Sequence, residues 1–125
     1  MIPHILDHTA LAAMGSRHMA QIMVEAAKEP GRPLLVPALC LAAATARRPR
    51  LGEFLLTLDK LRFLPLGGVE GHCLGELLES GVDWAFAHAA FEARPKADSP
   101  EGRPVCTALP ARYAGMGMTI REIIP

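Results

Sequence analysis

The sequence predicts a three-layer α/β/α domain, in which helices cover both faces of a central, mainly parallel sheet of roughly five strands. Short apolar runs, typical of buried strands, alternate along the chain with longer segments of helical periodicity. Such alternation implies right-handed crossovers between parallel strands. The 125 residues, 50% of them hydrophobic, are enough for one core, so we expect residues 1–125 to form a single domain.

The predicted elements follow one another in the order that such a sheet requires. The last apolar segment alternates with polar residues, which is typical of an edge strand. A polar, proline-containing stretch near the C-terminal end is expected to be a loop at 94–103. Strands are expected at 4–6, 34–36, 62–66, 104–107 and 118–124. Helical segments are expected at 9–14, 17–28, 38–47, 51–60, 68–80 and 84–93.

Capping and turn residues justify these boundaries. Ser16 is a favourable N-cap for the second helix, and the segment 29–33, with two prolines and a glycine, ends it. Pro37 suits the first turn of the helix that follows the second strand. Pro65 keeps the third strand short, and Asp83 begins the last helix.

Composition and charge exclude several classes of protein. Thirteen basic and thirteen acidic residues leave no net charge, so a polyanion would need a local basic patch. No apolar run reaches membrane-spanning length and no signal-peptide pattern begins the chain, so we expect a cytoplasmic protein without membrane contact. Three widely spaced cysteines without a Cys-x-x-Cys pair indicate reduced, buried thiols. Nucleotide-binding glycine motifs and a G-x-S-x-G elbow are absent.

Several polar residues stand where the fold would bring them together. Asp7 follows the first strand, Thr107 ends the fourth, and Asp83 precedes a helix. In a doubly wound sheet these positions can border one crevice outside the carboxyl ends of the strands. Each acid also has a simpler interpretation, because aspartate is a common helix N-cap.

These motifs, in this order, resemble a PIN domain, the small nuclease fold of many bacterial toxin ribonucleases, over nearly the whole chain. Asp7, with a threonine two residues later, matches the opening motif of that family, and Asp83 before an alanine-rich helix matches its third. The second motif carries an acid six residues after a proline, but Ala43 occupies that place. In the fourth motif Thr107 fits, but Leu109 stands where the family has aspartate.

The resemblance implies a metal site that has lost part of its acids. PIN nucleases use magnesium or manganese, and here only Asp7 and Asp83 would remain as catalytic acids and metal ligands. Two carboxylates hold such an ion weakly. We therefore expect a non-catalytic binding or regulatory module with no cofactor. The alternative is a weak magnesium- or manganese-dependent ribonuclease, possibly the toxin-like partner of an antitoxin.

Four further residues are candidates for substrate binding. The hydroxyls of Thr9 and Thr107 could orient a phosphate, or could form local hydrogen bonds to the backbone. Arg47 and Arg48, in a basic patch with Arg50, could contact RNA phosphates, or could simply lie at a solvated helix end. The expected partners are a second copy in a homodimer, a protein from an adjacent gene, or RNA.

Two roles are open for each of three neighbouring residues. His8 is expected to be exposed, or to contact the metal ligands without binding the ion itself. Cys40 is expected to fill the core, with a reactive thiol in the crevice as the alternative. Trp84 is expected in the core or at an interface.

Overall fold

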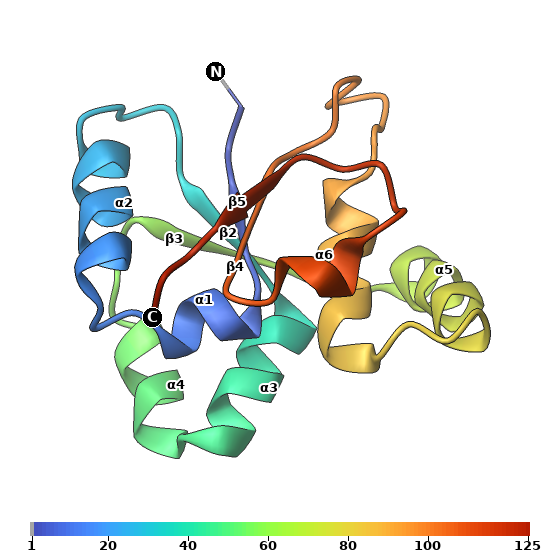
Figure 1. Cartoon of the computed structure of the whole chain (residues 1–125), viewed down its shortest axis with the longest axis horizontal. Coiled ribbons are helices and arrows are strands. Elements are labelled where there is room, and N and C mark those ends of the chain that lie inside the picture. Colours follow the sequence, from blue (N-terminus) through green and yellow to red (C-terminus); the bar gives the residue numbers. More distant parts are fainter. Residues whose placement is uncertain (1) are drawn as a thin grey trace.

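The computed structural model describes residues 2–125, and in this part of the chain five parallel strands form one sheet with helices on both sides (Figure 1). The prediction of a three-layer α/β/α fold is therefore confirmed. The strands are β1 (Ile5–Leu6), β2 (Leu34–Pro37), β3 (Leu61–Leu64), β4 (Val105–Thr107) and β5 (Ile120–Glu122). The helices are α1 (His8–Ala12), α2 (Arg17–Ala27), α3 (Ala38–Arg47), α4 (Pro49–Leu55), α5 (Gly68–Glu79), α6 (Trp84–Ala93) and the 3-10 helix η1 (Pro110–Tyr113).

The strand order β3-β2-β1-β4-β5 places the shortest strand at the centre of the sheet. The chain leaves β1 toward β2 and β3, then returns to β4 on the other side of β1. Ile5 consequently pairs with Leu35 of β2 and with Val105 of β4. This reversal of direction is the topological switch point, outside which α/β proteins bind their ligands. Asp7 directly follows β1 and Thr107 ends β4, so both lie beside it.

The core lies between the sheet and the two helical layers. Both residues of β1 and all of β2 are buried, as expected for strands covered on both faces. Figure 1 shows α2 on one side of the sheet and α6 on the other. Most of α6 is buried, and its alanines Ala87, Ala89 and Ala90 are fully inaccessible. Their small side chains allow close approach of neighbouring elements, which explains why this helix is alanine-rich.

Some predicted boundaries were wrong for identifiable reasons. The third strand ends at Leu64 rather than at residue 66, because Pro65 has no N–H for the ladder. The fourth helix spans Pro49–Leu55 rather than 51–60, and the Thr57 hydroxyl hydrogen-bonds Phe54 O beyond its end. The last strand is limited to Ile120–Glu122, the residues that pair with β4, and it lies at the predicted edge.

No helix within residues 2–125 is both long enough and apolar enough to cross a membrane.

Candidate functional site

Asp7 is fully buried, and donors from the protein itself occupy its carboxylate. Oδ1 accepts the backbone N–H groups of Thr9 at 2.9 Å and Ala10 at 3.0 Å, so Asp7 is the N-cap of α1. The Thr9 hydroxyl donates to the same oxygen at 2.6 Å. The second oxygen, Oδ2, accepts the Tyr113 hydroxyl at 2.7 Å. Both oxygens are therefore satisfied without a metal ion or water.

The two threonines join the ends of β1 and β4. Their Oγ1 atoms lie 3.0 Å apart, and because the Thr9 hydroxyl hydrogen is directed at Asp7, Thr107 is the donor of this pair. Thr9 Oγ1 also accepts the Ala108 N–H at 2.8 Å, and Thr107 Oγ1 accepts the Leu109 N–H at 3.0 Å. Thr107 thus makes the local backbone hydrogen bond that was one of its two alternatives, whereas the backbone hydrogen bond of Thr9 joins it to a residue 99 positions away.

Tyr113 completes this buried group from the far end of the sequence. It is 2% exposed, and its ring meets the Phe86 ring edge-on at 5.6 Å between centroids. Burial, reinforced by the negative charge and hydrogen bond of Asp7, raises the pKa of Tyr113 well above that of a free phenol. The side chain is therefore a permanent donor. This role of Tyr113 was not predicted, because no local pattern links a tyrosine to an acid 106 positions earlier.

A crevice of about 360 Å³ lies outside the carboxyl ends of the strands, at the switch point. We refer to it as the carboxyl-edge crevice. Its wall includes Ala43, Arg47, Asp83, Trp84, Leu109 and Arg112. The structure thus brings the two positions without acids, Ala43 and Leu109, into one site with Asp83. Asp7, Thr9 and Thr107 do not line this crevice, and neither does Arg48.

The two candidate acids differ in accessibility. Asp83 is exposed at the crevice, and its Oδ1 accepts the Ala85 N–H at 2.9 Å as the N-cap of α6. Asp7 is inaccessible and fully hydrogen-bonded. Within residues 2–125, no group of three or more histidine, cysteine, aspartate or glutamate side chains is arranged to hold a metal ion. A two-metal centre needs more carboxylate oxygens than Asp83 offers.

Two arginines give the crevice a local positive charge. Arg47 ends α3 and Arg112 lies in η1, and both are exposed. In the part of the chain that the structure describes, neither is in an ion pair. The Arg112 guanidinium lies over the Phe86 ring at 5.2 Å, which orients it. Arg47 was a candidate because of its basic patch, whereas Arg112, which has no basic neighbour in sequence, was not predicted.

The exposure of His8, Trp84 and Cys40 decides between the alternative roles of each residue. His8 is buried, so the exposed alternative was wrong; its ring packs edge-on against Phe86 at 4.9 Å, and burial lowers its pKa. Trp84 is 46% exposed, so the core alternative was wrong, and it forms part of the crevice wall. Cys40 is fully buried and fills the core as predicted, and burial raises its pKa, which makes a reactive thiolate unfavourable.

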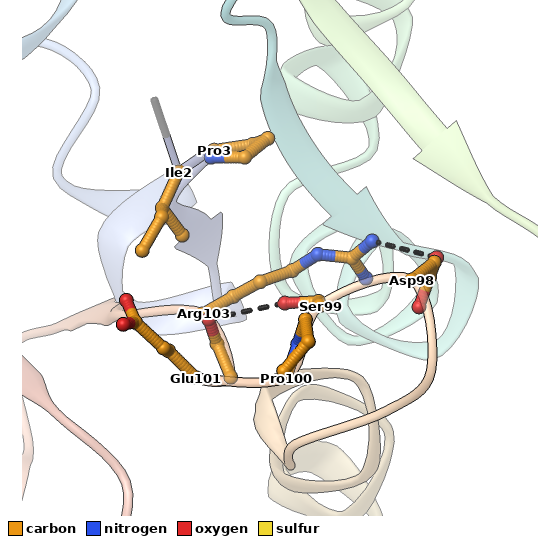
Figure 2. Close-up of a pocket in the computed structure, with 8 residues that line it drawn as sticks. Ile2, Pro3, Asp98, Ser99, Pro100, Glu101 and Arg103 are labelled. Carbon is orange, nitrogen blue, oxygen red and sulfur yellow. Dashed lines mark hydrogen bonds and ion pairs between the residues drawn. The ribbon is translucent and has the colours of Figure 1, made fainter.

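A second cavity, of about 450 Å³, lies where the strands begin, at the edge of the sheet opposite the crevice (Figure 2). Ile2 and Pro3 face the loop before β4 across this cavity. Arg103 spans part of it and donates to Asp98 at 3.3 Å. None of the candidate residues lines it, so the carboxyl-edge crevice is the better candidate site.

Comparison of the sequence with known families and with curated proteins finds no match. The site therefore defines the chain only as a three-layer α/β/α protein with an arginine-bearing crevice, poor in acids, at its switch point.

Proposed function

We propose that this chain is a PIN-like binding or regulatory module that does not hydrolyse phosphodiesters. The observation that carries the proposal is the 2.7 Å hydrogen bond from Tyr113 to Asp7 Oδ2. It places a neutral donor on the oxygen that a metal ion would need. Ala43 and Leu109, in the positions where the PIN resemblance expects acids, supply no oxygen ligand to the crevice.

The chemistry of divalent cations supports this proposal. Magnesium and manganese prefer several oxygen ligands in octahedral order, with carboxylates to balance their charge. A cation in the crevice would have Asp83 as its acid and would be repelled by Arg47 and Arg112. To reach Asp7 it would have to displace the buried phenol of Tyr113 from Oδ2.

Three kinds of partner are proposed for such a module. Trp84 and Leu109 are 46% and 45% exposed on the crevice wall, and a second copy of the chain or the product of an adjacent gene could cover them. RNA is the third candidate, through the two arginines.

A metal titration tests the proposal. Thermal unfolding would be followed with and without millimolar manganese for the wild type, Asp7→Asn and Asp83→Asn, with Asp98→Asn, outside the crevice, as the matched control. We expect the same midpoint with and without the ion in every protein. Incubation of the wild type with a mixed RNA pool should leave the RNA intact.

The opposite outcome would establish the alternative of a weak metal-dependent ribonuclease. A midpoint that rises with manganese in the wild type and not in Asp83→Asn would show selective binding of the ion at the crevice. Cleavage of the RNA pool that is abolished by Asp83→Asn but retained by Asp98→Asn would reject the non-catalytic assignment.

A further inference from the structure

We propose that the carboxyl-edge crevice binds a mononucleotide, a sugar phosphate that carries a flat base, without a metal ion. The inference rests on the proposed function, since a hydrolase would instead need the ion there. It names the class of ligand that a non-catalytic module of this geometry would hold.

The arginines define the charged part of this ligand. A guanidinium presents a fork of donors that matches the oxygens of a phosphate, and it needs no metal to do so. Arg47 approaches the crevice from the end of α3, and Arg112 approaches it from η1. Neither has a carboxylate partner within residues 2–125, so a phosphate would meet two unneutralised guanidinium groups.

The negative charge of Asp83 in the crevice suits a ligand that carries a sugar with hydroxyl groups. Asp83 uses Oδ1 to cap α6, while its Oδ2 accepts no hydrogen bond from any residue between 2 and 125. A free carboxylate oxygen repels a phosphate but accepts hydrogen bonds from ribose hydroxyls, as an acid does in dinucleotide-binding folds. Asp83 therefore favours a ligand that carries hydroxyls next to its phosphate over a bare inorganic anion.

An apolar surface is available for the base. Trp84 is the first residue of α6 and is 46% exposed on the crevice wall, and Leu109 is 45% exposed there. A half-exposed indole offers a stacking face that any nucleobase can use. Ala43, with its small side chain, also lines the crevice, and the volume of about 360 Å³ lies in the range of pockets for small ligands.

Calorimetric titration in the presence of EDTA tests the inference with three probes: 5′-AMP, adenosine and inorganic phosphate. We expect 5′-AMP to bind at least about tenfold more tightly than either part alone, because only the whole ligand engages both arginines and Trp84. Trp84 is the only tryptophan, so stacking should also quench the intrinsic fluorescence of the protein. A dinucleotide with a 5′-phosphate forms a fourth arm: tighter binding than 5′-AMP would identify a strand end as the natural source, and equal binding a free mononucleotide.

Four exposed substitutions locate the site. Arg47→Gln and Arg112→Gln should each weaken 5′-AMP binding about tenfold, and Trp84→Leu should weaken it about tenfold or more. Arg48→Gln is the matched control, because it removes the same charge one residue away from Arg47 but outside the crevice, and it should have no effect. Circular dichroism would verify that each variant is folded.

Two results would overturn the inference. One is 5′-AMP that binds no more tightly than phosphate; the other is a loss in Arg48→Gln equal to that in Arg47→Gln, which would indicate diffuse attraction. Failure of the proposed function looks different, because it would appear as manganese-dependent stabilisation or RNA cleavage. A protein that is inert to manganese and to RNA but does not bind 5′-AMP would reject this inference alone.

Discussion

The Tyr113 hydroxyl donates a 2.7 Å hydrogen bond to Oδ2 of Asp7, and this bond joins residues that are 106 positions apart in the sequence. Asp7 lies at the end of the central strand, and Tyr113 ends the 3-10 helix after β4. The contact therefore fixes the connection between β4 and β5 over the switch point. Asp7 is a carboxylate at the position where such folds usually bind ligands, but here it holds two parts of the structure together.

Removal of the Tyr113 hydroxyl should destabilise the fold measurably. Tyr113→Phe keeps the ring but leaves Asp7 Oδ2 buried without its donor, so the free energy of unfolding should fall by about 2 kcal/mol, the scale of a hydrogen bond to a charged group. Denaturant unfolding would measure the change. Thr57→Val removes an exposed hydroxyl that bonds to Phe54 O, and should cost less than about 0.5 kcal/mol as the control.

The same substitution in a second background tests whether the effect passes through Asp7. Asp7→Ser keeps an N-cap oxygen for α1 but removes the oxygen that faces Tyr113. In that background Tyr113→Phe should cost less than about 0.5 kcal/mol, which gives a coupling energy of roughly 1.5 kcal/mol. Equal costs in both backgrounds would show that the Tyr113 hydroxyl stabilises the fold by another route.

Adding acids to the crevice should create a metal site. Ala43→Glu with Leu109→Asp adds two carboxylates beside Asp83, and Tyr113→Phe in the same chain removes the donor from Asp7. We expect manganese at ten to a hundred times its dissociation constant to raise the free energy of unfolding of this triple variant by about 1–3 kcal/mol. Thermal unfolding with and without manganese would measure it.

A distant pair of acids controls for general charge effects in that experiment. Val69→Glu with Leu78→Asp adds the same charge on exposed positions of α5, again with Tyr113→Phe, and should give no manganese effect. If the two triple variants respond alike, or if neither responds, Ala43 and Leu109 do not mark the ligand positions that the PIN resemblance implies.

The sequence was sufficient to predict the fold because that prediction depends on local patterns. The buried strand before Asp7 and the N-cap at Asp83 are each readable within a few residues. The proline was read less well, because Pro37, expected in the first turn of the third helix, ends β2 and is the N-cap of α3. The same patterns predicted that Asp7, Thr107 and Asp83 border one crevice, because the carboxyl ends of parallel strands meet at one edge. Of these three residues only Asp83 lines the crevice, together with Ala43 and Leu109.

The chemistry of the site depended on contacts that no local pattern encodes. Nothing near Tyr113 in sequence indicates that its hydroxyl reaches Asp7, and nothing near Arg112 indicates that Phe86 orients it. The predicted exposure of His8 was wrong for a related reason. In an extended strand the side chains of Asp7 and His8 would point in opposite directions, but α1 begins at His8, and the His8 ring packs against Phe86.

Buried histidines should make the protein less stable in mild acid. His88 is inaccessible, and its Nδ1 accepts the Leu39 N–H at 3.3 Å near the start of α3. Burial lowers its pKa below the value of 6.5 for a free histidine, although Glu92 and Glu70 oppose this and Lys96 adds to it. The folded state thus favours neutral His88. Its contribution to stability is complete above about pH 6.5 and is lost as the pH falls through the lowered pKa.

Denaturant unfolding between about pH 7.5 and 5 would measure this dependence. His88→Gln should flatten it, although the lowered pKa values of His4 and His8 will leave part of the slope. His72→Gln, at a side chain that is 81% exposed, should leave the slope unchanged. An identical slope in the wild type and in His88→Gln would mean that another group controls the acid sensitivity.

The close contact between α3 and α4 predicts opposite effects for two glycine substitutions. A Cβ on Gly52 would overlap Thr45 Oγ1 and lie 3.0 Å from Thr45 Cβ, so Gly52→Ala should lower the free energy of unfolding by about 1–3 kcal/mol. Gly75, inside α5, has nothing within 4 Å of a Cβ, so Gly75→Ala should raise it by up to about 1 kcal/mol. Denaturant unfolding of both variants would measure the two signs. Thr45→Ala removes the overlapping oxygen and should recover part of the loss in Gly52→Ala, and no recovery would place the clash elsewhere.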